Sequence, residues 1–150
     1  MTRRFVLDTN VIWYGFKDEA YRERIFASYW PLHFSAVTLA ELASHADSAG
    51  RGQLEQARTV AAKARRVFAP TTVDWNMVGG YLFDHRPKGR THLSAELRLQ
   101  IARMQNDALI AVSSWSRGWS VVTCDGDDFQ RLAAYFPHFA ERLIVEAAPA

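Results

Sequence analysis

The chain has 150 residues and a formal net charge of +2, with 49% hydrophobic and 23% charged residues. These values are typical of a globular domain with a sizeable core, and they exclude a disordered chain and a general polycation. The single cysteine, Cys124, excludes an internal disulfide framework. No signal region is apparent and no run approaches the ~18 apolar residues of a membrane span, so we expect a cytoplasmic protein with one domain over residues 1–150.

The first half of the chain alternates short apolar runs with helical patterns. A strand is predicted over Arg4–Leu7, and Asp8 follows it as the N-cap of a helical stretch that opens at Val11. The remaining predictions are a helix over Asp18–Tyr29, a strand over Leu32–Ser35, helices over Val37–Ala46 and Gln53–Phe68 separated by a break at Gly50–Gly52, and a candidate third strand near Val67–Ala69.

In the second half, Asp74 is predicted to cap a helix over Trp75–Phe83, and residues 85–91 form a basic loop. Ser94 caps a helix over Ala95–Met104, and a separate helix begins near Asp107. The last predictions are a break at Gly118, a buried strand over Ser120–Thr123, an acidic turn, a helix over Gln130–Tyr135 and an edge strand over Arg142–Glu146. Strands that alternate with helices predict an α/β fold with a parallel sheet covered on both faces.

Four acids lie at or near the ends of these predicted elements: Asp8, Glu41, Asp107 and Asp125. Each has a structural alternative, because Asp8 and Asp107 could be N-caps, Glu41 could favour its helix through the macrodipole, and the DGDD turn could be solvated. The first and fourth strands of a doubly wound sheet can lie side by side, which would bring Asp8 and Asp125 to one crevice. Converging acids raise one another's pKa unless a cation intervenes, and Mg²⁺ takes oxygen ligands.

Four motifs occur in series: LDTNV at Leu7–Val11, TLAEL at Thr38–Leu42, NDALIA at Asn106–Ala111 and TCDGDDF at Thr123–Phe129. With these motifs the chain resembles a PIN-domain ribonuclease of the kind found as the toxin of VapBC toxin–antitoxin pairs. The resemblance implies a three-layer α/β/α fold with a five-stranded parallel sheet of order 3-2-1-4-5. It also implies Mg²⁺- or Mn²⁺-dependent cleavage of RNA (tRNA, rRNA or mRNA), a homodimer and a small VapB-like antitoxin as partner.

The resemblance assigns an acidic quartet of Asp8, Glu41, Asp107 and Asp125, with the metal on Asp8, Asp107 and Asp125. It gives supporting roles to three polar residues beside these acids: Thr9, Asn106 and Thr123. Asp127 is an extra acid beside the family pattern, which leaves open whether Asp125, Asp127 or Asp128 touches metal. Asp125 is the first choice, and Asp128 is expected to cap the helix that contains Phe129.

Three basic residues of the loop after Phe83 are candidate RNA contacts, although a solvated loop would also contain them: Arg86, Lys88 and Arg90. The five tryptophans could stack on bases, but their helical spacing favours packing for most of them. The aromatic residues 13–16 and the helix over residues 21–29 are equally consistent with core packing and with an apolar groove for a partner.

Two other functions fit parts of the sequence. A catalytically inert PIN-like module that binds RNA or protein would not need to keep four mutually repelling acids. A cation-dependent phosphatase would need an Asp-x-Asp pair after the first strand, which this chain lacks. The five histidines show no close metal-ligand spacing and no nucleophile partner, which favours water activated by a metal over a histidine pair.

Overall fold

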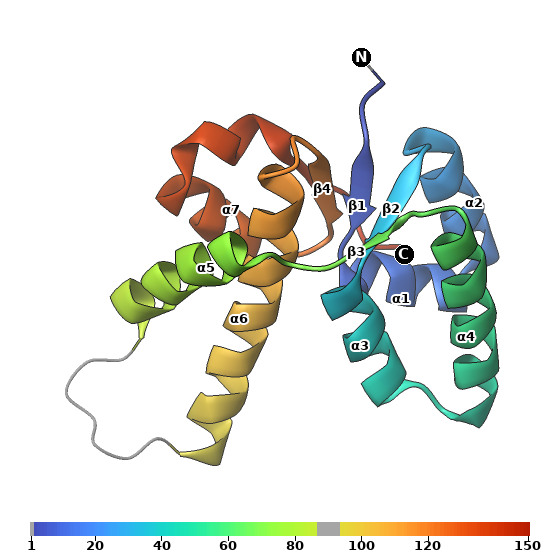
Figure 1. Cartoon of the computed structure of the whole chain (residues 1–150). Helices are drawn as coiled ribbons and strands as arrows, with labels where there is room; N and C mark the ends of the chain where they lie inside the picture. Colours follow the sequence, from blue (N-terminus) through green and yellow to red (C-terminus); the bar gives the residue numbers. More distant parts are fainter. Residues whose placement is uncertain (1, 87–93) are drawn as a thin grey trace.

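A computed structural model describes residues 2–86 and 94–150. The strands are β1 (Phe5–Leu7), β2 (Leu32–Ser35), β3 (Val67–Phe68), β4 (Ser120–Thr123) and β5 (Leu143–Val145). They form one five-stranded parallel sheet in the order β3-β2-β1-β4-β5 (Figure 1). The predicted sheet, its order and the adjacency of the first and fourth strands are therefore confirmed.

The two central strands are covered on both faces, and every residue of β1 and β4 is buried. Their parallel register pairs Phe5 with Ser120 and Leu7 with Val122. The backbone N–H of Asp8 then donates to the carbonyl oxygen of Val122 at 2.9 Å. Because the pairing is parallel, the chain leaves β1 and β4 at the same edge of the sheet, where the acids that follow both strands come together.

Two groups of helices cover the two faces of the sheet. The helices are α1 (Thr9–Lys17), α2 (Glu19–Ser28), α3 (Ala36–His45), α4 (Ser48–Lys63), α5 (Thr72–His85), α6 (Ala95–Trp115) and α7 (Gly126–Tyr135), with a 3₁₀ helix η1 (Pro137–Arg142) before β5. Figure 1 shows α5, α6 and α7 to the left of the sheet, α2 and α4 to its right, and α1 below the strands. None of the helices within the described residues combines the length and the apolar character that crossing a membrane requires.

Three apolar clusters fill the layers. The largest lies between α5, α6, α7 and the sheet, and includes Trp115, Val121 and Phe129. The second joins β1, β2 and β4 to α1 and α2, and the third packs Leu39 and Leu42 of α3 against Leu54 of α4. The sheet therefore separates the layer of α5–α7 from the layer of α1, α2 and α4.

The predicted helix over Gln53–Phe68 is wrong at both ends. The helix begins at Ser48 and includes both glycines, because the side chain of Asp47 caps it by accepting from the backbone N–H of Gly50 at 2.7 Å. It ends at Lys63, and Arg65 then adopts a positive φ of 54°. Val67 and Phe68 pair with β2 as the third strand, which confirms the candidate strand predicted near Val67–Ala69 and agrees with the strand preference of β-branched and aromatic residues.

Three predicted helix starts are also wrong. Thr71 caps α5. Asp74 lies three residues later, and its carboxylate accepts a hydrogen bond from the backbone N–H of Thr71, which completes a capping box. Ser94 caps α6 as expected, but α6 continues without a break to Trp115, so Asp107 lies inside it and is no N-cap. Asp125, not Asp128, caps α7, which begins at Gly126.

Candidate metal centre

Asp8 lies at the end of β1 and is 3% exposed. One carboxylate oxygen accepts from the backbone N–H of Thr9 at 2.7 Å and caps α1, while the other accepts from the hydroxyl of Thr123 at 2.9 Å. The pKa of Asp8 is raised to about 7, mainly by burial and to a lesser extent by the charges of Glu41 and Asp125, while these hydrogen bonds oppose the rise. A carboxylate has about four lone-pair sites, so two remain for a further ligand.

Asn10 ties the ends of β1 and β4 together, and the sequence reading did not single it out. Its side-chain carbonyl oxygen accepts from the backbone N–H of Cys124 at 3.1 Å, and its amide nitrogen donates to the hydroxyl of Thr123 at 3.4 Å. The same hydroxyl accepts from the backbone N–H of Asp125 at 3.0 Å. An amide side chain offers both the donor and the acceptor that these two hydrogen bonds require. The position of Asn10 within LDTNV is the only feature of the sequence that points to this role.

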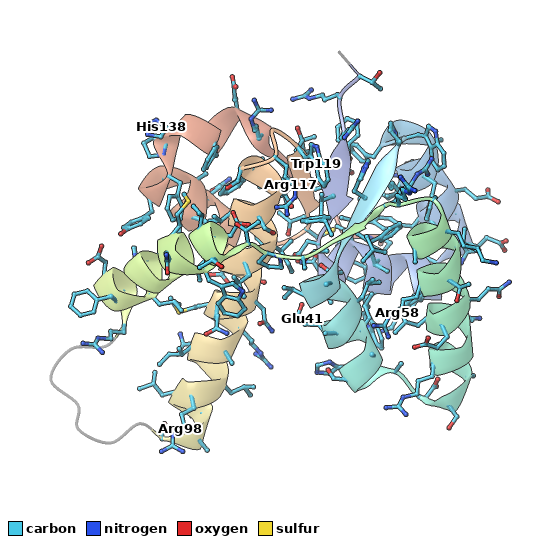
Figure 2. All side chains as sticks on the ribbon, in the orientation of Figure 1. Glu41, Arg58, Arg98, Arg117, Trp119 and His138 are labelled. Carbon is cyan, nitrogen blue, oxygen red and sulfur yellow. The ribbon has the colours of Figure 1, made fainter. Side chains whose placement is uncertain are left out.

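Glu41 projects from α3 toward residues of two other helices. One of its carboxylate oxygens accepts from the hydroxyl of Thr9, and the other accepts from the side-chain amide of Asn106 at 2.8 Å. Glu41 is labelled in Figure 2, where it lies on the side of α3 that faces α6. It is not in the first turn of its helix, so the macrodipole alternative does not explain it. Thr9 and Asn106 therefore hold this carboxylate in place.

Three carboxylates form the tightest acidic group among the described residues. One oxygen each of Asp107, Asp125 and Asp128 lies within 4.8 Å of the others. Asp107 comes from the interior of α6, Asp125 from the cap of α7 and Asp128 from its first turn. The structure thus places Asp128 with the acids, where the sequence predicted a cap, and leaves Asp127 exposed outside the group.

The electrostatics of this triad indicate a cation. Burial, the largest cause, and the charges of Asp8, Glu41, Asp128 and Asp125 together raise the pKa of Asp107 to about 8. The pKa of Asp128 is raised by burial and then by Asp125, although Arg131 donates to it at 3.3 Å. An all-oxygen donor set suits a hard cation such as Mg²⁺ or Mn²⁺ over a soft one. These residues therefore fit a divalent cation, which would relieve the repulsion.

The predicted RNA contacts lie mostly outside the described residues. Lys88 and Arg90 belong to the segment 87–93, which the structure does not describe. Arg86 is exposed at the C-terminal cap of α5, and its guanidinium carbon lies 4.7 Å from the ring centre of Phe83. The role of these three residues stays a prediction.

Comparison with known proteins concerns the family and the fold of this chain. The PIN domain family profile matches residues 5–135. A DNA-bound VapBC from Salmonella typhimurium is similar in fold with a TM-score of 0.55 and 23% identity, over 99% of this chain and 100% of that chain. FitAcB from Neisseria gonorrhoeae gives a TM-score of 0.58 and 17% identity, over 95% and 96% of the two chains. No functionally curated protein matches the chain by sequence.

The raised pKa of Asp107 predicts how the stability of the metal-free protein depends on pH. Folding raises this pKa from 3.8 to about 8, so the folded state becomes less stable relative to the unfolded state as the pH rises through that interval. Asp107→Asn stays neutral and escapes this loss. In EDTA, the melting temperature of Asp107→Asn should exceed that of the wild type, and this difference should be larger at about pH 9 than at about pH 5.

The matched control is Asp127→Asn, because Asp127 is a neighbouring acid that is exposed and outside the triad. It should shift the melting temperature little and equally at both pH values. A gain for Asp107→Asn that does not grow with pH would contradict the crowding of charge around Asp107.

Proposed function

The chain belongs to the PIN domain family, and on that premise we propose that it is a Mg²⁺- or Mn²⁺-dependent endoribonuclease, the toxin of a toxin–antitoxin pair. Proteins of this family are generally nucleases. The observation that carries the proposal is the acidic triad of Asp107, Asp125 and Asp128, with Asp8 and Glu41 close enough to raise the pKa of Asp107. A module that only binds RNA would be destabilised by these acids without using them.

In the proposed mechanism, the triad would hold the cation, and Asp8 would add negative charge or an additional oxygen ligand. When bound, the cation supplies Lewis-acid stabilisation of charge on the phosphate and lowers the pKa of water. An ionised Asp107 or Asp125 oxygen can accept a proton from the attacking water and orient it toward the phosphorus. Glu41 is fixed by Thr9 and Asn106, so we assign it a positioning role at the border of the site.

The side chains of Thr123 and Asn10 keep the acids in position before substrate arrives. Together they make four hydrogen bonds, which link Asp8 to the backbone of Cys124 and Asp125. Repelling carboxylates would otherwise separate, and ordering them in advance removes a reorganisation from the reaction itself. We therefore propose Thr123 and Asn10 as positioning residues; the family resemblance gave Thr123 a supporting role.

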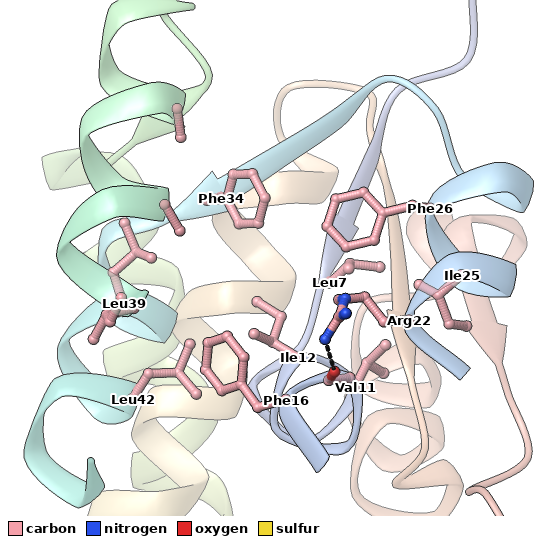
Figure 3. A pocket seen from close by; sticks show the side chains of 14 residues that line it. Leu7, Val11, Ile12, Phe16, Arg22, Ile25, Phe26, Phe34, Leu39 and Leu42 are labelled. Atoms are coloured by element: carbon pink, nitrogen blue, oxygen red, sulfur yellow. Dashed lines mark hydrogen bonds between the residues drawn. The ribbon is translucent and has the colours of Figure 1, made fainter. Parts of the chain in front are cut away.

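The similar solved structures are VapBC and FitAB assemblies, which supports a protein partner for this chain. An apolar groove suited to such a partner lies between α1, α2, α3 and α4 (Figure 3). Its cavity of about 190 Å³ has Phe16, Phe26 and Leu42 among its walls. An adjoining hollow shares Phe26 and extends to Trp30, which is 59% exposed. We call this surface the α2–α4 groove.

Residues of α2 that line the α2–α4 groove differ in exposure, which supports a core role for one and a partner role for the other. Ile25 is buried and belongs to the core, whereas Phe26 is 41% exposed and forms an open wall. Arg22 is the only charged residue that lines the cavity within the described chain, and it donates to the carbonyl oxygen of Gly15 at 3.0 Å. We propose that the antitoxin lays an apolar helix here and extends a basic side chain toward the acids.

The first prediction from this function concerns cleavage. Asp107→Asn and Asp8→Asn should each reduce Mg²⁺- or Mn²⁺-dependent RNA cleavage by about 100-fold or more, because each removes a carboxylate that would hold the cation, and the cation stabilises the transition-state charge. Expression of the wild type should arrest growth, and neither variant should do so. Purified proteins incubated with RNA and Mg²⁺, Mn²⁺ or EDTA provide the measurement.

Asp127→Asn is again the matched control and should cleave like the wild type. Circular dichroism should show that all variants are folded. Full cleavage by either Asp107→Asn or Asp8→Asn would contradict the assigned acids, and RNA binding without cleavage by the wild type would favour the inert module.

A second prediction concerns the ends of the products. Attack by water on the phosphorus, in line with the departing 3′-oxygen, leaves a 5′-phosphate and a free 3′-hydroxyl. The 2′-hydroxyl makes no new bond, so a 2′-deoxy substitution at the cleaved nucleotide should slow cleavage only modestly, through recognition. Digestion with a 5′-phosphate-dependent exonuclease and ligation at the 3′ end identify the products. Cyclic 2′,3′-phosphate formed equally well in EDTA would exclude the acidic site as the catalyst.

A third prediction tests the α2–α4 groove. Phe26→Asp should weaken binding of a small inhibitor protein encoded beside this chain by roughly 30-fold or more, as expected for a hot-spot side chain. It should leave RNA cleavage intact, because Phe26 is not among the acids. Co-purification and relief of growth arrest by co-expression provide the measurements. Phe83→Asp is the control, since Phe83 is 59% exposed on α5, and equal binding by both variants would exclude the groove.

A further inference from the structure

A second cleft opens beside the acidic site, and we propose that it holds one base of the RNA strand next to the phosphate that is cut. The proposal rests on the function above, and it adds a substrate subsite to that function. The cleft lies between α3, α5 and α6 and has a volume of about 450 Å³, within the range of about 300–1,000 Å³ that is usual for ligand sites. We call it the Trp75 cleft.

The Trp75 cleft shares two walls with the acidic site. Glu41 and Asn106 line it, and these are the residues joined by the 2.8 Å hydrogen bond between α3 and α6. Asp107 of the triad is the next residue after Asn106 on α6. If the phosphate of a nucleotide lies at the triad, the cleft is therefore next to that nucleotide and can receive a base. The hydrogen bond between Glu41 and Asn106 lies between the two sites.

Trp75 forms the aromatic wall and is 48% exposed, so its indole is available to a ligand. The remaining walls are largely aliphatic, including Ala40 and Leu109. An indole beside aliphatic side chains is a surface on which a flat base can stack, and stacking tolerates any base because every base has a π-face. Trp75 is therefore an exception to the expectation that packing explains most of the tryptophans, since Trp115 is buried and Trp13 and Trp119 are partly buried.

The N-terminal turn of α5 is anchored, which makes Trp75 a rigid platform. Asp74, 1% exposed, accepts from the backbone N–H of Thr71 at 2.7 Å and from Arg117 at 3.5 Å. Arg117, labelled in Figure 2, also donates to the carbonyl oxygens of Ala69 at 2.8 Å and Ser113 at 2.6 Å. This joins the start of α5 to the end of α6, so little conformational freedom of the backbone is lost when a base stacks on Trp75.

The charges of the Trp75 cleft select a base over a phosphate. Within the described residues, Glu41 is the only charged side chain that lines it, and no lysine or arginine does. A phosphate would be repelled there, whereas a neutral base would not. An amide has two N–H donors and one carbonyl acceptor, so the bond to Glu41 leaves groups of Asn106 that can pair with a base edge.

The test compares Trp75→Ala and Trp75→Phe with Trp30→Ala, a control in which another exposed tryptophan is removed, from the α2–α4 groove and not from the Trp75 cleft. Trp75→Ala should lower kcat/KM for RNA by roughly 5- to 150-fold, the factor that stacking of one base supplies. Trp75→Phe keeps an aromatic face and should stay within about threefold of the wild type, as should Trp30→Ala.

An abasic scan of the substrate separates stacking from a structural effect. Each nucleotide around the cut is replaced in turn by an abasic residue. At one position the wild type should lose as much kcat/KM as Trp75→Ala loses with intact RNA, and Trp75→Ala should lose nothing further there. Losses that simply add at every position, or a Trp75→Ala protein that cleaves like Trp30→Ala, would overturn the proposal.

A binding measurement keeps this test independent of cleavage. Fluorescence anisotropy of a labelled oligoribonucleotide in EDTA reports affinity for the same three variants and for the abasic strands. If the wild type does not cleave RNA, the proposed function fails, and the binding data alone decide on the subsite. Unchanged affinity in Trp75→Ala together with a change of oligomeric mass in sedimentation would overturn the proposal and assign Trp75 to a protein interface.

Discussion

The parallel pairing of β1 with β4 is the constraint on which the rest of the structure depends. It is made of buried apolar residues on both strands, and it aligns Leu7 with Val122 so that Asp8 and the turn at Asp125 emerge at one edge. In an antiparallel arrangement these acids would lie at opposite ends of the strands. The candidate site is therefore a consequence of strand direction, and the hydrophobic cores on both faces stabilise that direction.

Bringing the acids together opposes folding, and the surrounding polar residues limit this effect. The pKa values of Asp8 and Asp107 rise to about 7 and about 8, which shows that their ionised forms are disfavoured in the folded protein without a cation. Hydrogen bonds from Thr9 and Thr123 offset part of this at Asp8. At Asp107 repulsion from four other carboxylates dominates after burial, so this side chain gains most from a bound cation.

Helix α3 belongs to both surfaces that we assign to function. Leu39 and Leu42 point into the α2–α4 groove, while Ala40, Glu41 and Ser44 line the Trp75 cleft. These two sets lie on different faces of one helix, as the 3.6-residue period requires. A partner seated in the groove would therefore contact the same helix that carries Glu41, and a small shift of α3 would reach the hydrogen bonds from Thr9 and Asn106.

The sequence by itself determined the α/β class, the buried strands, and the four motifs that bring Asp8, Glu41, Asp107 and Asp125 into one region. These features are local: apolar runs of strand length, caps and turn residues can be recognised without knowing the partners of a segment. The sheet order was an expectation from the family resemblance, and the structure confirmed it.

Only the tertiary structure decided which segments satisfy one another. Val67 and Phe68 lay within both a predicted helix and a candidate strand, and their pairing with β2 decided for the strand. Asp107 lies in the interior of a helix because α6 runs without a break to Trp115. Asp125 is the N-cap of α7, which the sequence had assigned to Asp128. Asp128 therefore lies in the first turn of α7, where its carboxylate joins the triad. The roles of Asn10 and Trp75 depend on neighbours more than 30 residues away in the chain, at Cys124 and Asn106, and local pattern carries no information about such contacts.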